Sequence, residues 1–346
     1  MPMSPIQPAV SRLRAYWRFI LAVAWFFLAR SLALREARLL VNEQWRPLVE
    51  QAMLLALLLV GYASMGLTLD RQLHPVSEQG LPRRTGWLSE ASLGMAVGWA
   101  LAVACVLPLL VGGGIAIVLI LGPSAWGWLA ADTAFFALLA LAEEVAFRGY
   151  GFQRFAESVG SLGAVLGYAG FYAIVQGLVP GSSRSSVAVS IVLSLALSIA
   201  YLRTRALWLS WGINFGWKAS RALLFGLAVS GVSSHSPVVQ GNPMGPFWLT
   251  GGGFGLDGSW VAFVVLVAAL PVVYRLTRDL DFRYNAPVIV PGGIPVDLDA
   301  AAHRQHEAAM GAVETATPGL VQILPATTPP MKGSEKTPTS QPPAAV

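Results

Sequence analysis

The sequence predicts an all-α protein, a polytopic transmembrane bundle of about eight helices, and two observations carry this prediction. Of its 346 residues, 55% are hydrophobic and only 12% are charged, whereas roughly 25% are charged in soluble domains. Apolar runs long enough to cross a bilayer also recur along the chain. So little charge excludes a soluble globule of this length, and so much apolar surface excludes disorder over most of the chain.

A helix needs about 20 mostly apolar residues to cross a bilayer. Spans are expected at residues 16–40, 50–69, 91–112, 126–146, 160–179, 187–202, 207–228 and 259–274. The first run is the weakest, because charged residues between Arg30 and Arg38 interrupt it. It either spans the bilayer or lies in the interface as an amphipathic helix. The third run, if it continues past Gly112 to Leu121, gives a kinked or tilted helix.

The remaining segments differ in composition from the spans. Residues 229–258 are rich in Gly, Ser and Pro, which predicts an external loop with many turns. From Asn285 onward the chain holds ten of its 23 prolines and no aromatic residue, so this tail cannot build a core. We therefore expect two N-terminal spans in residues 1–79, a membrane bundle in 80–284 and a disordered cytoplasmic tail in 285–346.

Arginines between the apolar runs predict the topology. Those expected at one end of the bundle are Arg12, Arg14, Arg18, Arg71, Arg83, Arg84, Arg148, Arg154, Arg203, Arg205, Arg275, Arg278 and Arg283. The other end has Arg46 and Arg184, and the 229–258 loop has no Lys or Arg. The positive-inside bias then places both termini in the cytoplasm. The net charge of +5 thus reports topology, and the expected partner is the lipid bilayer, with no nucleic acid.

Ionisable residues inside a span are informative, because each costs roughly 2.5–3.5 kcal/mol on insertion scales. The fourth run ends with Glu143, Glu144 and Arg148. Adjacent glutamates point about 100° apart on a helix, while Glu144 and Arg148, four residues apart, can pair on one face. Glu143 is then free to titrate or to position a water. The alternative is a helix end whose charges extend into the headgroup region.

Two further runs contribute polar side chains. In the seventh run, Asn214 and Lys218 are one turn apart and share a face. Lys218 is the only lysine in the first 331 residues. In the fifth run Gln176 places an amide within the bundle, where a hydrogen bond between helices is the simpler interpretation. For Lys218 the simpler alternative is a side chain that faces lipid and extends to its surface.

The pattern Glu143-Glu144-x-x-x-Arg148 resembles the first motif of the CPBP family of intramembrane proteases, also called the Abi or CAAX-processing protease family. The basic turn Arg203-Thr204-Arg205 is similar to the one that precedes the last motif helix of that family. The order of the motif helices and the glycine-rich loop 249–255 fit as well. The resemblance covers roughly residues 80–275 and implies a membrane-embedded endopeptidase of a bacterial plasma membrane.

In that family the paired glutamates are followed by an aromatic-x-x-x-His and then by a His-x-x-x-Asn or Asp. The resemblance implies that a glutamate and the histidines activate a water, with or without a metal such as zinc, and that the Asn stabilises the oxyanion. This chain departs from the pattern at three positions, where it has Gln176, Asn214 and Lys218. Its four histidines are His74, His235, His303 and His306, all in predicted loops or the tail. No cofactor is therefore expected, because the zinc ligands are missing.

Two glutamates buried without metal or imidazole need another cation or must protonate. We therefore expect the ammonium of Lys218 to reach the Glu143–Glu144 pair. Three interpretations stay open. The first is a degenerate, non-hydrolytic protein that binds peptide or lipid-modified chains. The second is an active peptidase of altered chemistry, with Glu143 or Glu144 as base and Gln176, Asn214 or Lys218 stabilising the oxyanion. The third is a transporter, which no inverted repeat supports.

Overall fold

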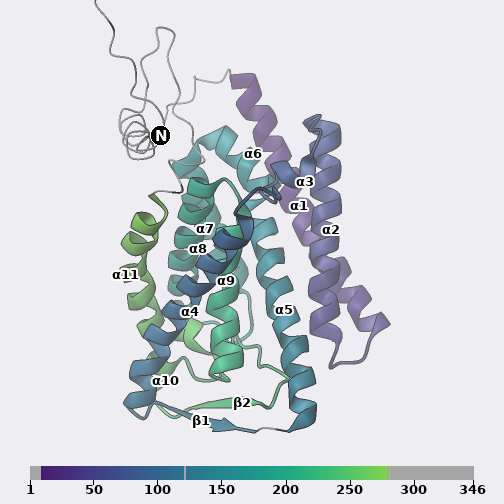
Figure 1. Ribbon diagram of the computed structural model, residues 1–346. Coiled ribbons are helices and arrows are strands. Elements are labelled where there is room, and N and C mark those ends of the chain that lie inside the picture. The colour runs from purple at the N-terminus through teal and green to yellow at the C-terminus, as the bar shows by residue number, and fades with distance from the viewer. Residues whose placement is uncertain (1–8, 121, 279, 281–346) are drawn as a thin grey trace, which may run out of the picture. The chain divides into compact units, whose positions relative to one another are not determined.

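The computed structural model describes residues 9–120, 122–278 and 280 of the chain. The long helices are α1 (Ala9–Leu40), α2 (Arg46–Leu69), α4 (Trp87–Val111), α5 (Pro123–Arg148), α7 (Ser161–Gly177), α8 (Arg184–Thr204), α9 (Leu207–Ala219) and α11 (Trp260–Leu276). Each of the eight predicted runs corresponds to one of these helices (Figure 1). The prediction of an all-α polytopic bundle is confirmed.

Shorter elements join the long helices. They are α3 (Pro75–Glu78), α6 (Tyr150–Val159), a π-helical turn (Ser220–Leu224), α10 (Phe247–Thr250), two 3-10 turns (Gly252–Phe254 and Leu256–Gly258), and the strands β1 (Ile115–Leu119) and β2 (Val239–Pro243). The predicted tail, residues 285–346, lies outside the described residues.

Five segments are long and apolar enough to cross a membrane. They are Ser11–Leu40, Arg46–Leu69, Trp87–Val111, Ala125–Val159 and Arg184–Thr204. The other three predicted spans, α7, α9 and α11, form helices of 17, 13 and 17 residues, shorter than a bilayer normally requires. The protein is thus an integral membrane protein whose long helices contact lipid.

The first apolar run forms one continuous helix of 32 residues. One face of α1 packs into a core cluster with α2, α5, α6 and α7, through side chains such as Phe26 and Ala29. This length and this packing favour a helix that crosses the membrane over one that lies in the interface.

The expected extension of the third run to Leu121 is wrong. Helix α4 ends at Val111, and a glycine turn follows in which Gly113 has φ +73°. Residues Ile115–Leu119 then form β1, which pairs antiparallel with β2 from the 229–258 loop. The turn breaks the helix because glycine adopts positive φ without strain, and the β-branched side chains after it favour a strand.

The seventh run also ends early. Helix α9 stops at Ala219, and the π-helical turn closes at Leu224, four residues before the expected end at residue 228. Beyond it Gly226 has φ +63°, and a Cβ added there would lie 2.7 Å from Gln240 Cα in β2. The chain turns here because this backbone contact leaves no room for a side chain.

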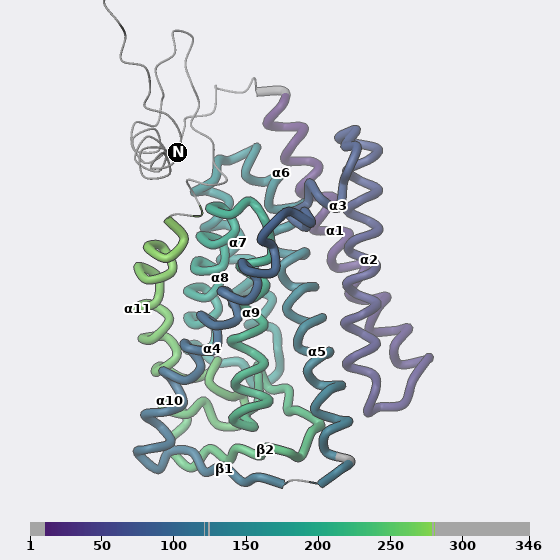
Figure 2. The backbone as a smooth tube through the Cα atoms, in the orientation of Figure 1, coloured from purple at the N-terminus to yellow at the C-terminus, as the bar shows by residue number. Residues whose placement is uncertain are grey.

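Glycines allow α4 and α9 to cross in close contact. A Cβ added at Gly94 would lie 2.9 Å from Gly212 Cα, and one added at Gly216 would lie 3.0 Å from Met95 Cα. Such small residues four apart let two helix backbones approach each other. Helix α9 also packs on α5, so it lies between α4 and α5 (Figure 2). This packing fixes the helix that carries Asn214 and Lys218.

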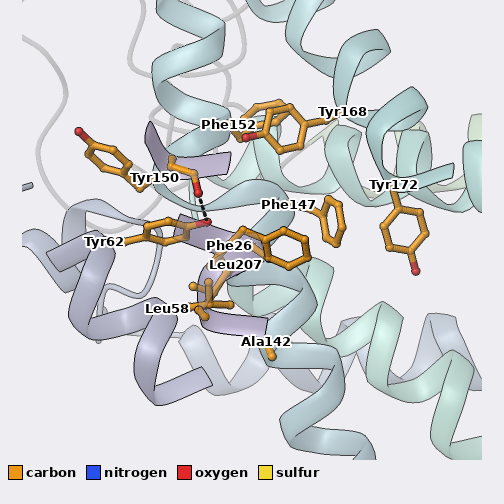
Figure 3. Close-up of a cluster of buried hydrophobic side chains, with 14 of the residues drawn as sticks. Phe26, Leu58, Tyr62, Ala142, Phe147, Tyr150, Phe152, Tyr168, Tyr172 and Leu207 are labelled. Carbon is orange, nitrogen blue, oxygen red and sulfur yellow. Dashed lines mark hydrogen bonds between the residues drawn. The ribbon is translucent and has the colours of Figure 1, made fainter. Parts of the chain in front are cut away.

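Aromatic side chains fill the core beside the ionisable residues. The rings of Phe147 and Tyr172 meet edge to face with centroids 4.9 Å apart. In Figure 3 the hydroxyl of Tyr172 points away from Phe147 and the other aromatic rings. On the other side of this core the hydroxyl of Tyr62 donates to the carbonyl oxygen of Ala22 at 3.4 Å. The core therefore directs the hydroxyl of Tyr172 toward the ionisable residues of α5.

Candidate functional site

The C-terminal half of α5 holds a fully buried ion pair. Arg148 Nη1 lies 3.2 Å from Glu144 Oε1, and neither side chain is exposed. The predicted pairing at four-residue spacing is therefore present. Arg148 Nη2 also donates to Oγ of Ser194 at 2.8 Å and to its carbonyl oxygen at 3.2 Å. These contacts from α8 fix the guanidinium on the side of Glu144.

Helix α9 brings Asn214 and Lys218 onto the glutamates. Asn214 Nδ2 donates to Glu143 Oε2 at 2.9 Å and to Glu144 Oε1 at 3.1 Å, so one amide bridges both acids. The ammonium of Lys218 contacts Glu143 Oε2 directly. Lys218 is 3% exposed, which excludes the alternative in which its side chain extends through lipid.

Helix α7 contributes Tyr172 directly and Gln176 only through Tyr172. The Tyr172 hydroxyl donates to Glu143 Oε2 at 3.4 Å, and Gln176 Nε2 donates to the Tyr172 hydroxyl at 3.1 Å. The Gln176 bond lies within α7, so it is not the expected bond between helices. Gln176 reaches the paired glutamates through one intermediate, whereas Asn214, Lys218 and Arg148 touch them.

A second buried ion pair lies just beyond Lys218. Arg221 Nη1 is 2.7 Å from Asp257 Oδ1. The other oxygen, Oδ2, accepts the backbone N–H of Ser230 at 3.0 Å and its hydroxyl at 2.9 Å. Burial alone raises the pKa of the Asp257 carboxyl, but Arg221, with smaller contributions from Lys218 and Ser230, holds that pKa below its ordinary value.

Sequence reasoning missed two partners of this site. Asp257 stood in a loop, where nothing marked it as the partner of Arg221. Ser194 belongs to a row of buried serines on α8 at four-residue spacing, Ser186, Ser190, Ser194 and Ser198. That periodicity is the signal that could have placed a polar face of α8 toward the charged residues of α5.

The histidines with described positions lie elsewhere. His74 precedes α3, and His235 lies on the 229–258 loop, where its Nδ1 is 3.1 Å from Oδ1 of the buried Asp132. His303 and His306 fall outside the described residues. Among the described residues the carboxylates of the site thus meet amide, ammonium, guanidinium and hydroxyl groups, and no imidazole.

The residues present do not fit a zinc ion. The described residues contain no group of three His, Cys, Asp or Glu side chains able to hold a metal. Asn214 turns its nitrogen, a donor, toward the acids. Two buried oxygens, Glu144 Oε2 and Asn214 Oδ1, have no hydrogen-bond partner, and these suit a buried water. Since Arg148 and Lys218 already neutralise both glutamates, a zinc ion would leave two uncompensated charges in an apolar interior.

Comparison with known proteins matches part of the chain. A family model described as type II CAAX prenyl endopeptidase Rce1-like matches residues 124–220, less than a third of the sequence. No curated protein matches the chain, and no solved structure does. The matched segment runs from the start of α5 to the end of α9 and contains Glu143, Glu144, Arg148, Gln176, Asn214 and Lys218. The predicted resemblance to the CPBP, or CAAX protease-like, family is therefore confirmed over the segment that builds this site.

Proposed function

We propose that this membrane protein has a CAAX-type protease fold that no longer hydrolyses peptide bonds by the chemistry of the family. In our proposal it binds a peptide or a lipid-modified chain at Glu143. The observation that carries the proposal is the ion pair between Lys218 and Glu143. The ammonium of Lys218 occupies the Glu143 carboxylate, which would otherwise act on a water.

Hydrolysis needs a general base with a free lone pair directed at a water. In this site Glu143 Oε2 already accepts from Lys218, Asn214 and Tyr172. Glu144 is fully buried and paired with Arg148. Oε2 of Glu143 is thus saturated with donors, and Glu144 has no surface open to an incoming substrate. Only Oε1 of Glu143 remains accessible.

Binding of a peptide requires only the accessible edge of the site, which Glu143 provides. The side chain of Glu143 is 14% exposed, and among the described residues nothing donates to its Oε1. Gln176 is half-buried nearby, and its amide nitrogen is used by Tyr172. An acceptor without a donor, such as Oε1 of Glu143, fits the free backbone N–H groups of an extended chain. A helical partner does not offer such groups, because its N–H groups are already paired. An extended peptide is thus the ligand that this edge suits best.

The second candidate is a peptidase of altered chemistry. The observation that favours it is the convergence of Asn214 Nδ2 and the Lys218 ammonium near Glu143, because two donors at one point could stabilise an oxyanion. In this case Glu143 would have to part from Lys218 when substrate binds. The binding protein and the altered peptidase predict different results for the experiment described next.

The test uses purified full-length protein in lipid nanodiscs with two fluorescent peptides of CAAX sequence, one farnesylated and one unmodified. We expect no cleavage by mass spectrometry, with or without added zinc, and binding that Glu143→Gln weakens about tenfold, the loss of one charge-assisted hydrogen bond. Glu36→Gln, a substitution on the exposed surface of α1, should bind as the wild type does. Cleavage lost in both Glu143→Gln and Glu144→Gln would establish the altered peptidase. Binding that Glu143→Gln leaves unchanged would remove the binding proposal.

A further inference from the structure

A surface without formal charge covers one end of the bundle and shares no residue with the candidate site. Strands β1 and β2 lie across that end, where α10 also lies (Figure 1). We call residues 115–119 and 239–250 the apolar ribbon. They belong to two segments, 91–131 and 222–256, that contain no Asp, Glu, Lys or Arg. Five large apolar side chains of the ribbon are between 48% and 70% exposed, namely Val118, Leu119, Met244, Phe247 and Trp248.

Bulk water does not suit this surface. Soluble proteins rarely expose large contiguous apolar patches, because contact between apolar surface and water is unfavourable. The exposed apolar surface also continues from the ribbon onto the helices beside it. Val111, the last residue of α4, is exposed where α4 contacts β1. Trp260, the first residue of α11, is exposed where α11 contacts α10.

The hydrocarbon core of a bilayer does not suit the ribbon either. Within the described residues β1 and β2 form a sheet of two strands, so β1 keeps an edge whose backbone N–H and C=O groups face no other strand. The exposed side chains of β2 are the amides of Gln240 and Asn242, which pair in register with Val118 and Ala116 of β1. Such groups need water or headgroup oxygens as partners, because hydrocarbon offers none.

The length of α4 places the ribbon at the membrane surface. Helix α4 has 25 residues and is apolar enough to span, and its length of about 37 Å exceeds the hydrocarbon thickness of about 30 Å. Only the glycine turn at residues 112–114 separates α4 from β1, and the next spanning segment, Ala125–Val159, begins soon after β1. The ribbon is therefore held between two spans at the level where both leave the bilayer.

We propose that the apolar ribbon lies in the headgroup region of the bilayer as an in-plane element, with its apolar side chains directed toward the acyl chains of phospholipids. This layer suits the whole ribbon, since it offers apolar contact on one side and hydrogen-bonding groups on the other. Tryptophan favours the same level, and Trp248 of α10 is exposed there. Part of the 229–258 segment is then a membrane anchor, and its test is independent of the proposed function.

The experiment measures membrane depth with nitroxide labels on single cysteines of the full-length protein in phospholipid vesicles. The native thiol, Cys105, is buried and is replaced by Ala. Labels at Val118→Cys and Met244→Cys are exposed to molecular oxygen, which concentrates in the bilayer, and to a water-soluble nickel chelate. Val60→Cys, exposed on the spanning helix α2, is the lipid reference. Glu43→Cys, whose side chain is 91% exposed before α2, is the water reference.

We expect the ratio of oxygen to nickel collision rates at residues 118 and 244 to be several-fold higher than at residue 43 and to approach the value at residue 60. A ratio at either position equal to that at residue 43 would overturn the proposal by placing the ribbon in water. Low collision rates with both reagents would overturn it too, because they would show that protein, such as a second copy of the chain, covers the ribbon. The two positions lie on different segments, so one reports alone if the other variant does not fold.

Discussion

The ammonium of Lys218 contacts Oε2 of Glu143 across the interface between α9 and α5, and the two side chains are 4% and 14% exposed. The lysine is thus enclosed while the glutamate keeps an accessible edge. The cation therefore contacts the glutamate from the inside of the bundle, and of the two side chains the glutamate is the more accessible.

The ion pair predicts a stability effect that depends on which partner is removed. Lys218→Met leaves Glu143 without its cation and should lower the free energy of unfolding by about 3 kcal/mol, the lower end for a broken buried pair because Glu143 is partly exposed. Adding Glu143→Gln should recover most of that loss. Thermal unfolding in detergent measures both effects, with Arg184→Gln as a control for loss of an exposed positive charge. A double variant less stable than Lys218→Met would contradict the pairing.

The three departures from the family pattern predict a gain of metal binding. The triple variant Gln176→His/Asn214→His/Lys218→Asn places one imidazole at the position that contacts both glutamates. It places a second imidazole on α7 beside Tyr172 and removes the competing ammonium. We expect it to hold about one zinc per chain, because imidazole and carboxylate are the ligands of such sites. Elemental analysis after dialysis measures the metal content. Stoichiometric zinc in the wild type would contradict the conclusion that its donor set does not fit the ion.

The close crossing of α4 and α9 predicts a position-specific sensitivity to one methyl group. Gly94→Ala places a Cβ 2.9 Å from Gly212 Cα and should destabilise the protein by about 1–3 kcal/mol, as overpacking does. Gly170→Ala on α7, where an added Cβ meets nothing within 4 Å, should be neutral or stabilise by about 0.4–1 kcal/mol. Melting temperatures in one detergent compare the pair. Equal effects at both glycines would show that the helix crossing is looser than described.

The buried Asp257 predicts a loss of stability in acid. Its folded-state pKa lies below its ordinary value of 3.8, so the unfolded chain takes up a proton first as the pH falls. The contribution of the Arg221 pair is then complete above about pH 5 and disappears as the pH falls through 3.8 toward the lowered value, by at most about 1.4 kcal/mol per pH unit.

Asp257→Asn tests this pH dependence. The variant should be less stable than the wild type at pH 7, because Arg221 loses its partner, and its stability should fall less steeply below pH 4. Unfolding followed from pH 7 to pH 3 gives both slopes, and the exposed Glu36→Gln should keep the wild-type slope. Parallel curves for wild type and Asp257→Asn would mean that this carboxyl does not titrate with folding.

The sequence was sufficient for the order of the long helices, though not for the ends of α4 and α9. It was also sufficient for the contacts that Glu144 makes with Arg148 and that Lys218 makes with Glu143. Continuous apolar runs predict helices, and spacing along one helix placed Glu144 with Arg148 and Asn214 with Lys218. The contact of Lys218 with the glutamates could be expected because a buried acid needs a cation. Whether any of these residues is catalytic stays a prediction.

What the sequence could not provide were partners far apart along the chain. The pairing of Arg221 with Asp257 joins a helix end to a loop 36 residues later, and no periodicity links the two. The pairing of β1 with β2 depends equally on tertiary contact. Gln176 sits on the expected helix, but the rotation of α7 directs its amide to Tyr172, and a rotation about the helix axis is decided by packing.

The order of the charges along the chain has a consequence for biosynthesis. Helix α5 carries two glutamates and one arginine, so it enters the membrane with an excess negative charge, and Lys218 is translated 75 residues after Glu143. Until α9 emerges, Glu143 must stay protonated, remain near water or be shielded by the insertion machinery. A chain truncated before residue 207 would lack Lys218 permanently. Its α5 would then carry Glu143 without a cation, a defect that cellular quality control could recognise.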